Sequence, residues 1–244
     1  MWNSYEPYTS EKHTPAASGF LGKIAKFIAV VFVFVVLLPV FLAGTLGFES
    51  SVMEPVFKEG DRVIYSPFAY GAQVFGIRFP GLGRPMRGDL AVLQPAWYPE
   101  KSFFQHLLDP VVSFFTLRNL SATSDRRGRA VSPFTVSRVI GLPGDTIRVE
   151  QDRIFVRPEN APEFIPELSL AAHPYTIKPA DLASGDPLLF QEPKEYMLLA
   201  DEYFLAGDNR ALFSDSRFQG PVRFAAIHGK VILRYWPFER FGSP

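Results

Sequence analysis

The chain has 244 residues, enough for one large or two small domains with a hydrophobic core. Lysine and arginine number 25, as do aspartate and glutamate, so the charge balance argues against a nucleic-acid partner. Cysteine is absent and the four histidines are scattered, which excludes a disulfide framework and predicts no metal and no cofactor.

The N-terminal part has the composition of a tail followed by a membrane anchor. Residues 1–22 show no apolar period and are predicted to be a flexible tail. From Phe27 to Phe48 the chain carries no charge, and about 20 apolar residues suffice to cross a bilayer. A cleavable signal peptide would have a shorter apolar region with an A-x-A-like end. A retained transmembrane anchor is therefore predicted over residues 23–48.

Charges beside the anchor predict its orientation. Lys23 and Lys26 precede the apolar run, and Glu49 follows it. Positive charge favours the cytoplasmic side. We therefore expect a single-pass protein of the inner membrane with a cytoplasmic N-terminus and an extracytoplasmic domain over residues 49–244.

Short runs of β-branched and apolar residues follow the anchor. Such runs are typical of strands, and turn signals such as Pro143–Gly144–Asp145 separate them. The 22 prolines also favour a β-rich domain. A mostly β, antiparallel architecture is predicted. The expected strands are Arg62–Tyr65, Leu90–Leu93, Thr135–Ile140, Thr146–Val149, Arg153–Val156, Tyr196–Ala200, Tyr203–Ala206 and Val231–Trp236.

The segment 101–130 departs from this pattern. Apolar residues recur at three- or four-residue steps in Ser102–Leu117, which predicts a helix interrupted by Pro110. A helix packed on the sheet is favoured over one that lies in the membrane interface.

Four motifs carry the most specific information. They are Ser50–Asp61 (SSVMEPVFKEGD), Arg87–Pro95 (RGDLAVLQP), Ser137–Asp145 (SRVIGLPGD) and Gly207–Pro221 (GDNRALFSDSRFQGP). With Arg234–Phe238 they resemble the sequence boxes of bacterial type I signal peptidases, peptidase family S26. The resemblance covers residues 24–238 outside the insertion and implies an N-terminal transmembrane helix before a β-rich extracytoplasmic domain.

The resemblance implies a serine nucleophile and a lysine general base, the lysine being neutral through burial. The nucleophile precedes the methionine of an S-x-S-M-x-P motif, and here Val52 precedes Met53. The base precedes the arginine of a K-R-x-x-G-L-P-G-D motif, and here Ser137 precedes Arg138. A further family serine, which supports the lysine, is replaced by Phe213.

These three departures predict a filled-in active site in a non-catalytic homologue, because apolar side chains avoid leaving unpaired polar groups where the amine is missing. The alternative is an active signal peptidase that cleaves exported preproteins with Ser51 or Ser50 as nucleophile. That alternative needs a shift of the segment, and a one-residue slip turns a side chain to the opposite face.

A groove for an extended peptide does not depend on the dyad, since strand addition uses main-chain hydrogen bonds. The expected partners are the lipid bilayer and either exported preproteins or an active signal peptidase paralogue, with no nucleic acid. A structural or assembly role in the envelope is the remaining alternative. The residues expected to bind the peptide are Phe48, Ser50, Met53, Val136 and Arg138, and those expected to support the site are Asp208, Asp215 and Arg217.

Overall fold

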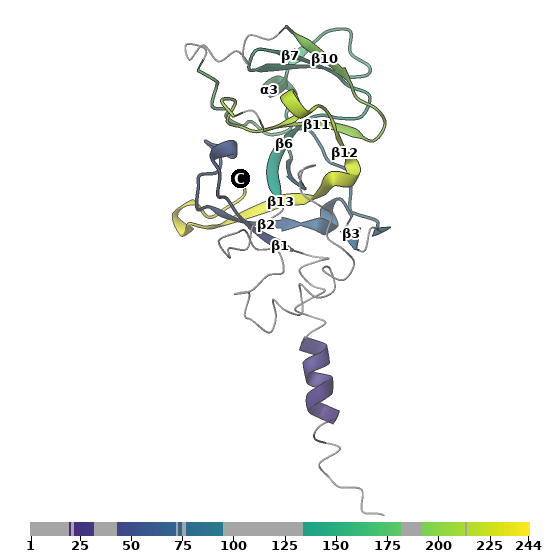
Figure 1. Ribbon diagram of the computed structural model, residues 1–244, viewed down its shortest axis with the longest axis vertical. Helices are drawn as coiled ribbons and strands as arrows, with labels where there is room; N and C mark the ends of the chain where they lie inside the picture. The colour runs from purple at the N-terminus through teal and green to yellow at the C-terminus, as the bar shows by residue number, and fades with distance from the viewer. Residues whose placement is uncertain are drawn as a thin grey trace, which may run out of the picture.

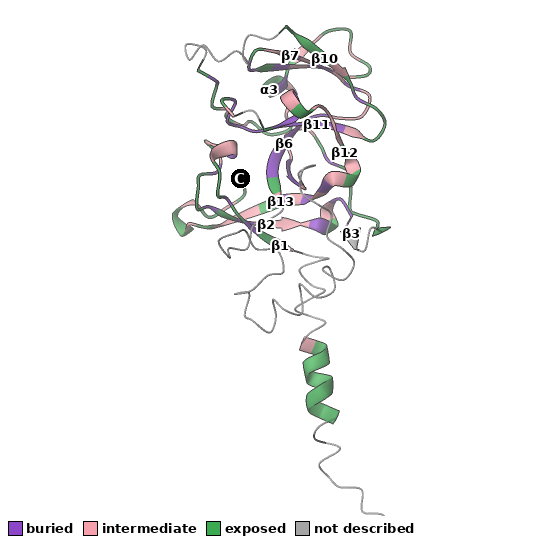
Figure 2. Ribbon diagram, in the orientation of Figure 1, coloured by how far each residue is buried: buried purple, intermediate pink, exposed green. Residues whose placement is uncertain are grey.

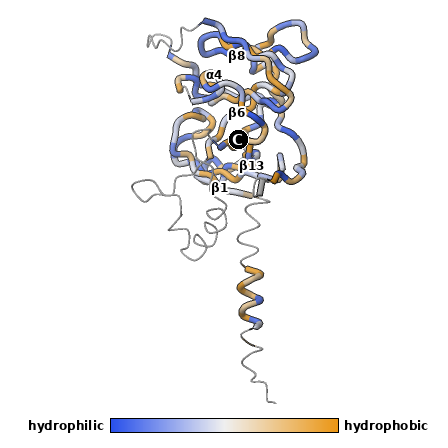
Figure 3. The backbone as a smooth tube through the Cα atoms, turned by 45° about the vertical axis from the view of Figure 1, so that its right-hand side comes forward, coloured by the Kyte–Doolittle hydropathy of each residue, from blue (hydrophilic) through white to orange (hydrophobic). Residues whose placement is uncertain are grey.

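The computed structural model describes residues 20, 22–31, 43–71, 73–74, 77–94, 134–181, 192–212 and 214–244. Residues 22–31 are helical, and Figure 1 shows this helix apart from the β domain. Mostly hydrophobic residues run along it in Figure 3. Across the described ranges, no helix combines the length and apolarity that a membrane crossing requires.

The predicted C-terminal boundary of the anchor is wrong. Gly44–Gly47 form strand β1, which pairs antiparallel with β2 (Arg62–Ser66). Leu46 is buried there, so apolarity in this stretch serves the core of the domain. A continuous apolar run does not distinguish a helix from a buried strand, which explains the error. Residues 32–42 of the predicted anchor lie outside the described residues.

A seven-stranded antiparallel sheet forms the larger layer of the domain (Figure 1). Its order is β1-β2-β13-β5-β6-β11-β12. Strand β6 is the fifth in this order and lies between β5 and β11. Besides β1 and β2, the strands are β5 (Leu90–Leu93), β6 (Thr135–Gly141), β11 (Glu202–Ala206), β12 (Val222–Arg223) and β13 (Ile227–Trp236).

A four-stranded antiparallel sheet lies at the other end of the domain, with the order β10-β7-β8-β9. The small pair β3 (Gln73–Val74) and β4 (Ile77–Arg78) stands apart from both sheets. The smaller sheet contains β7 (Thr146–Glu150), β8 (Arg153–Arg157), β9 (Ile165–Pro166) and β10 (Lys194–Met197). Short helical turns are η1 (Ser51–Met53), η2 (Pro67–Ala69), α3 (Glu167–Leu170), α4 (Ser216–Gln219), η5 (Phe224–Ala226) and η6 (Phe238–Arg240).

The mostly β, antiparallel prediction is confirmed. Seven of the eight predicted strands coincide with observed strands within a few residues at each end, whereas the predicted Tyr196–Ala200 is displaced to Lys194–Met197. Five short strands, β1, β3, β4, β9 and β12, were not predicted. The predicted helix Ser102–Leu117 and the whole 101–130 insertion lie outside the described residues.

Three apolar clusters form the core, and β6 contributes to each of them through Val136, Val139 and Ile140. Much of β6 is buried in Figure 2. The cluster that matters for the site, here called the turn cluster, packs under the η1 turn. Its buried members are Leu46, Phe48, Met53, Phe57, Val63, Leu90, Val92, Val136 and Val231.

Candidate functional site

The η1 turn is held on the turn cluster from below. Ser50 caps it, because the Ser50 hydroxyl accepts a hydrogen bond from the Val52 N–H at 3.4 Å. Met53 is 1% exposed, and the ring of Phe48 stacks on Phe57 with centroids 4.4 Å apart. The turn also packs beside β6. The sequence therefore brings the segment of the predicted nucleophile position next to the strand of the predicted base position.

The loop Gly207–Arg210 packs on the other side of this turn. The Asn209 main-chain N–H donates to the carbonyl of Val52 at 3.0 Å, and its side-chain amide donates to the carbonyl of Ser51 at 3.0 Å. A Cβ at Gly207 would lie 2.8 Å from Val52 Cγ1 and from the Val52 carbonyl oxygen. The loop thus contacts Val52 directly, and Gly207 is required for that approach.

Strand β6 carries Ser137 and Arg138 into the interior. Ser137 is 7% exposed and lies opposite Ala91 of β5. Arg138 donates from Nε and Nη2 to the two carboxylate oxygens of Asp208 at 2.7 and 2.6 Å, and from Nη1 to the Gly88 carbonyl at 2.8 Å. This buried, bidentate geometry makes the pair costly to break, since one partner alone would be an uncompensated charge.

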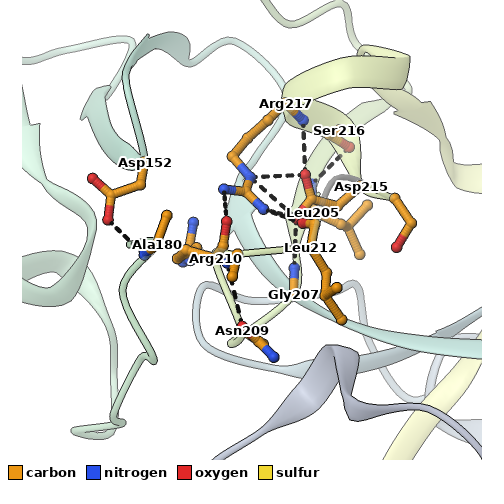
Figure 4. Close-up of polar contacts among 12 residues, drawn as sticks. Asp152, Ala180, Leu205, Gly207, Asn209, Arg210, Leu212, Asp215, Ser216 and Arg217 are labelled. Atoms are coloured by element: carbon orange, nitrogen blue, oxygen red, sulfur yellow. Dashed lines mark hydrogen bonds and ion pairs between the residues drawn. The ribbon is translucent and has the colours of Figure 1, made fainter. Parts of the chain in front are cut away.

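A second ion pair folds the segment after the loop (Figure 4). Asp215 accepts from Arg217 Nε at 2.9 Å and from the Gly207 N–H at 2.9 Å. Arg217 also donates to the carbonyls of Arg210 and Leu212, at 3.0 and 2.7 Å. Both partners are almost fully buried. Asp215 and Arg217 therefore shape the loop, as supporting residues would.

Arg210 joins the loop to two residues that the motifs did not indicate. Its Nη2 donates to Glu167 at 2.7 Å, and the Tyr175 hydroxyl donates to the same carboxylate at 3.1 Å. Burial raises the pKa of Glu167, and Arg210 offsets part of that increase. Burial and the neighbouring Glu167 raise the pKa of Tyr175. The Tyr175 ring also covers the Arg138 guanidinium, 4.1 Å from its centroid.

The hydroxyl of Ser50, a candidate substitute nucleophile, accepts its hydrogen bond from the main chain of Val52. Across the described ranges, no hydrogen bond joins the hydroxyl of Ser50 or Ser51 to a lysine or histidine side chain. Lys178 is held instead by Glu54, with 2.9 Å between Nζ and Oε2. The predicted position Phe213 lies outside the described residues.

Comparison with known proteins identifies the family of this chain. A family model described as signal peptidase, peptidase S26, matches residues 21–236. The chain belongs to this family. The resemblance carried by the four sequence motifs is thereby confirmed, and the buried ion pairs described above lie within the matched range of this S26 member.

Three curated relatives of this S26 member illustrate the similarity. Signal peptidase I of Pseudomonas fluorescens is 28% identical over 208 residues, which cover 79% of this chain and 60% of that protein. "Probable signal peptidase I-2" of Synechocystis sp. is 23% identical, covering 96% of this chain and 81% of the relative. Signal peptidase I of Bacillus caldolyticus is 39% identical over 107 residues, which cover 43% of this chain and 56% of that protein. The chain thus spans less than two thirds of the Pseudomonas and Bacillus proteins.

Proposed function

We propose that this chain is a non-catalytic member of the S26 family that holds extended peptides, such as the signal-peptide region of exported preproteins, between the η1 turn and β6. The observation that carries the proposal is that hydrogen bonds and ion pairs hold the site in place, while the side chains at the nucleophile and base positions cannot act as nucleophile and general base. Asn209 holds the turn, and the Arg138–Asp208 ion pair holds the adjoining loop on β6. Val52 and Ser137 supply neither a nucleophile nor an amine at the positions that the family motifs indicate.

The hydrogen-bonding pattern of β6 supports strand addition. Val139 bonds through its N–H and C=O to Asp89 and Gly88, on the β5 side. In an antiparallel pair, alternate residues direct both polar groups to the same neighbour. Val136 therefore directs its N–H and C=O toward the opposite edge, where β11 pairs with β6 from Gly141 to Arg138. The main chain of Val136 lies beyond that paired stretch and is suited to bind an added strand.

The surroundings of this edge are apolar. Val136, Phe48 and Met53 belong to the turn cluster, and Val52 packs against it. Small or apolar side chains of a bound peptide would therefore meet an apolar wall. Arg138 was expected to touch the peptide, but its guanidinium is engaged by Asp208, Gly88 and Tyr175. We assign Arg138 a supporting role.

The membrane location is also part of the proposal. Large apolar side chains are exposed on β13, η6 and near β4: Trp236 is 46% exposed, Phe238 71%, Phe241 60%, Ile77 65% and Leu82 79%. Strands β1, β2 and β13 and the β3 region lie at the end of the domain toward the helix 22–31 (Figure 1). Aromatic side chains favour the membrane interface. We infer that this end faces the inner membrane, with residues 1–22 on the cytoplasmic side.

A binding measurement on the full-length chain in detergent tests the peptide groove. A fluorescent peptide that spans a signal-peptide cleavage region is expected to bind. The same peptide with one N-methylated amide in its central residues is expected to bind at least about tenfold more weakly. The methylated nitrogen can no longer donate a main-chain hydrogen bond, and the methyl group blocks strand pairing. Equal affinity for the two peptides contradicts binding by strand addition, and no binding of either peptide contradicts the groove itself.

A further inference from the structure

The loop Gly207–Arg210 is the middle layer of a three-segment stack. On one side Asn209 bonds to the carbonyls of Ser51 and Val52. On the other side Lys178 donates its N–H to Asp208 and accepts from the Arg210 N–H, both at 2.8 Å. The outer layers are therefore the η1 turn and the segment 175–180, which we call the strap.

The strap is fixed at both of its ends. At its start, the partly buried Tyr175 donates from its hydroxyl to Glu167, and its ring covers Arg138. At its end, the Ala180 N–H donates to the buried Asp152 carboxylate at 3.2 Å (Figure 4). Lys178 lies between these two anchors. Its main chain is therefore held in place, and only its side chain is free to reach across the stack.

That side chain joins the two outer layers. Lys178 Nζ lies 2.9 Å from Glu54 Oε2, and Glu54 follows the η1 turn directly, 124 residues earlier in the chain. The ion pair is partly exposed, with 53% of the Lys178 side chain and 29% of the Glu54 side chain accessible. An exposed ion pair contributes little to global stability and is screened by salt. Its effect is consequently local, on the turn that it holds.

We propose that Lys178 is a positioning residue: through its ion pair with Glu54 it holds the η1 turn against the loop Gly207–Arg210 and so sets the width of the peptide groove beside β6. The strap acts on bound peptide only through the turn. The part that concerns peptide affinity rests on the proposed peptide-binding function, whereas the part that concerns the turn does not.

The test compares Lys178→Met, Lys178→Arg and Glu54→Gln in the full chain. The matched control is Glu195→Gln, which breaks the partly exposed Arg148–Glu195 pair on the smaller sheet, whose Nη2 and Oε1 atoms lie 2.8 Å apart. Amide hydrogen exchange of residues 51–54 is expected to be about two- to fivefold faster in Lys178→Met and Glu54→Gln, the range for an exposed ion pair. The Lys178→Arg variant is expected to exchange as the unmutated chain does, and the control to be unchanged in this segment.

Peptide affinity provides the second readout. Lys178→Met and Glu54→Gln are each expected to weaken binding by a similar factor, and the double variant by no more than either single one, because both remove the same contact. Unchanged exchange at residues 51–54 in both single variants overturns the positioning role. If the unmutated chain binds no peptide, the proposed function fails, while the exchange measurement still decides the role of Lys178.

Discussion

At the scale of single residues, the contact between Val52 and Gly207 is the most specific feature of the site. The loop approaches the turn so closely that a Cβ on Gly207 would lie 2.8 Å from both Val52 Cγ1 and the Val52 carbonyl oxygen. The flexible end of a side chain could move aside, but the carbonyl belongs to the main chain that Asn209 holds. Glycine is therefore needed here for close approach of two backbones.

Replacing Gly207 by alanine is expected to destabilise the chain by about 1–3 kcal/mol, the usual cost of overpacking. Urea-induced unfolding measures the change. Gly47→Ala is the matched control, because an added Cβ at Gly47 has no neighbour within 4 Å. A loss of stability at Gly207 no larger than at Gly47 would show that the loop and the turn separate easily in solution.

At the scale of elements, the sequence predicted the long strands and missed the connections that build the site. Leu90–Leu93 was predicted with the bounds that the structure shows, because a short apolar run between turn residues has few alternatives. Two-residue strands such as Ile165–Pro166 have no periodicity to detect. Glu167, Tyr175 and Lys178 also lie outside the family motifs. Only folding brings them beside Arg210 and Glu54, so spacing along the chain gave no signal for them.

The element α3 supplies a pH-dependent prediction. Burial raises the pKa of Glu167 above its ordinary value of 4.5 in the folded chain. The folded state then binds this proton more tightly than the unfolded state does, so the contribution of Glu167 to stability is largest at low pH and is lost as the pH rises through the raised pKa. Glu167→Gln removes the titration. The unfolding free energy of the unmutated chain minus that of Glu167→Gln is expected to fall as the pH rises from about 4.5 and then to level off.

Urea denaturation of both proteins at a series of pH values measures this difference. A difference that increases with pH would mean that the ion pair with Arg210 outweighs the cost of burial and that folding lowers the pKa instead. The sign of the pH dependence therefore shows whether burial or the ion pair with Arg210 dominates the pKa of Glu167.

At the scale of the whole molecule, the family and the β architecture were predicted correctly from the sequence, whereas the C-terminal boundary predicted for a membrane anchor was wrong. The motif order predicted the S26 family that the family model confirms. Strand β1, by contrast, lies in an apolar run that was predicted to be a membrane segment from its hydropathy alone. The motifs assigned the positions Val52 and Ser137, and the structure adds their surroundings. The loop at Gly207 contacts Val52 closely, and Ser137 is buried in strand β6.

The absence of peptidase activity is the central claim. The direct test is prolonged incubation of an exported preprotein with the purified, full-length chain in detergent, followed by intact-mass measurement of the preprotein. We predict that its mass stays unchanged. Cleavage after a small residue, abolished by Ser51→Ala or Ser50→Ala, would contradict the account and identify a working nucleophile in the turn.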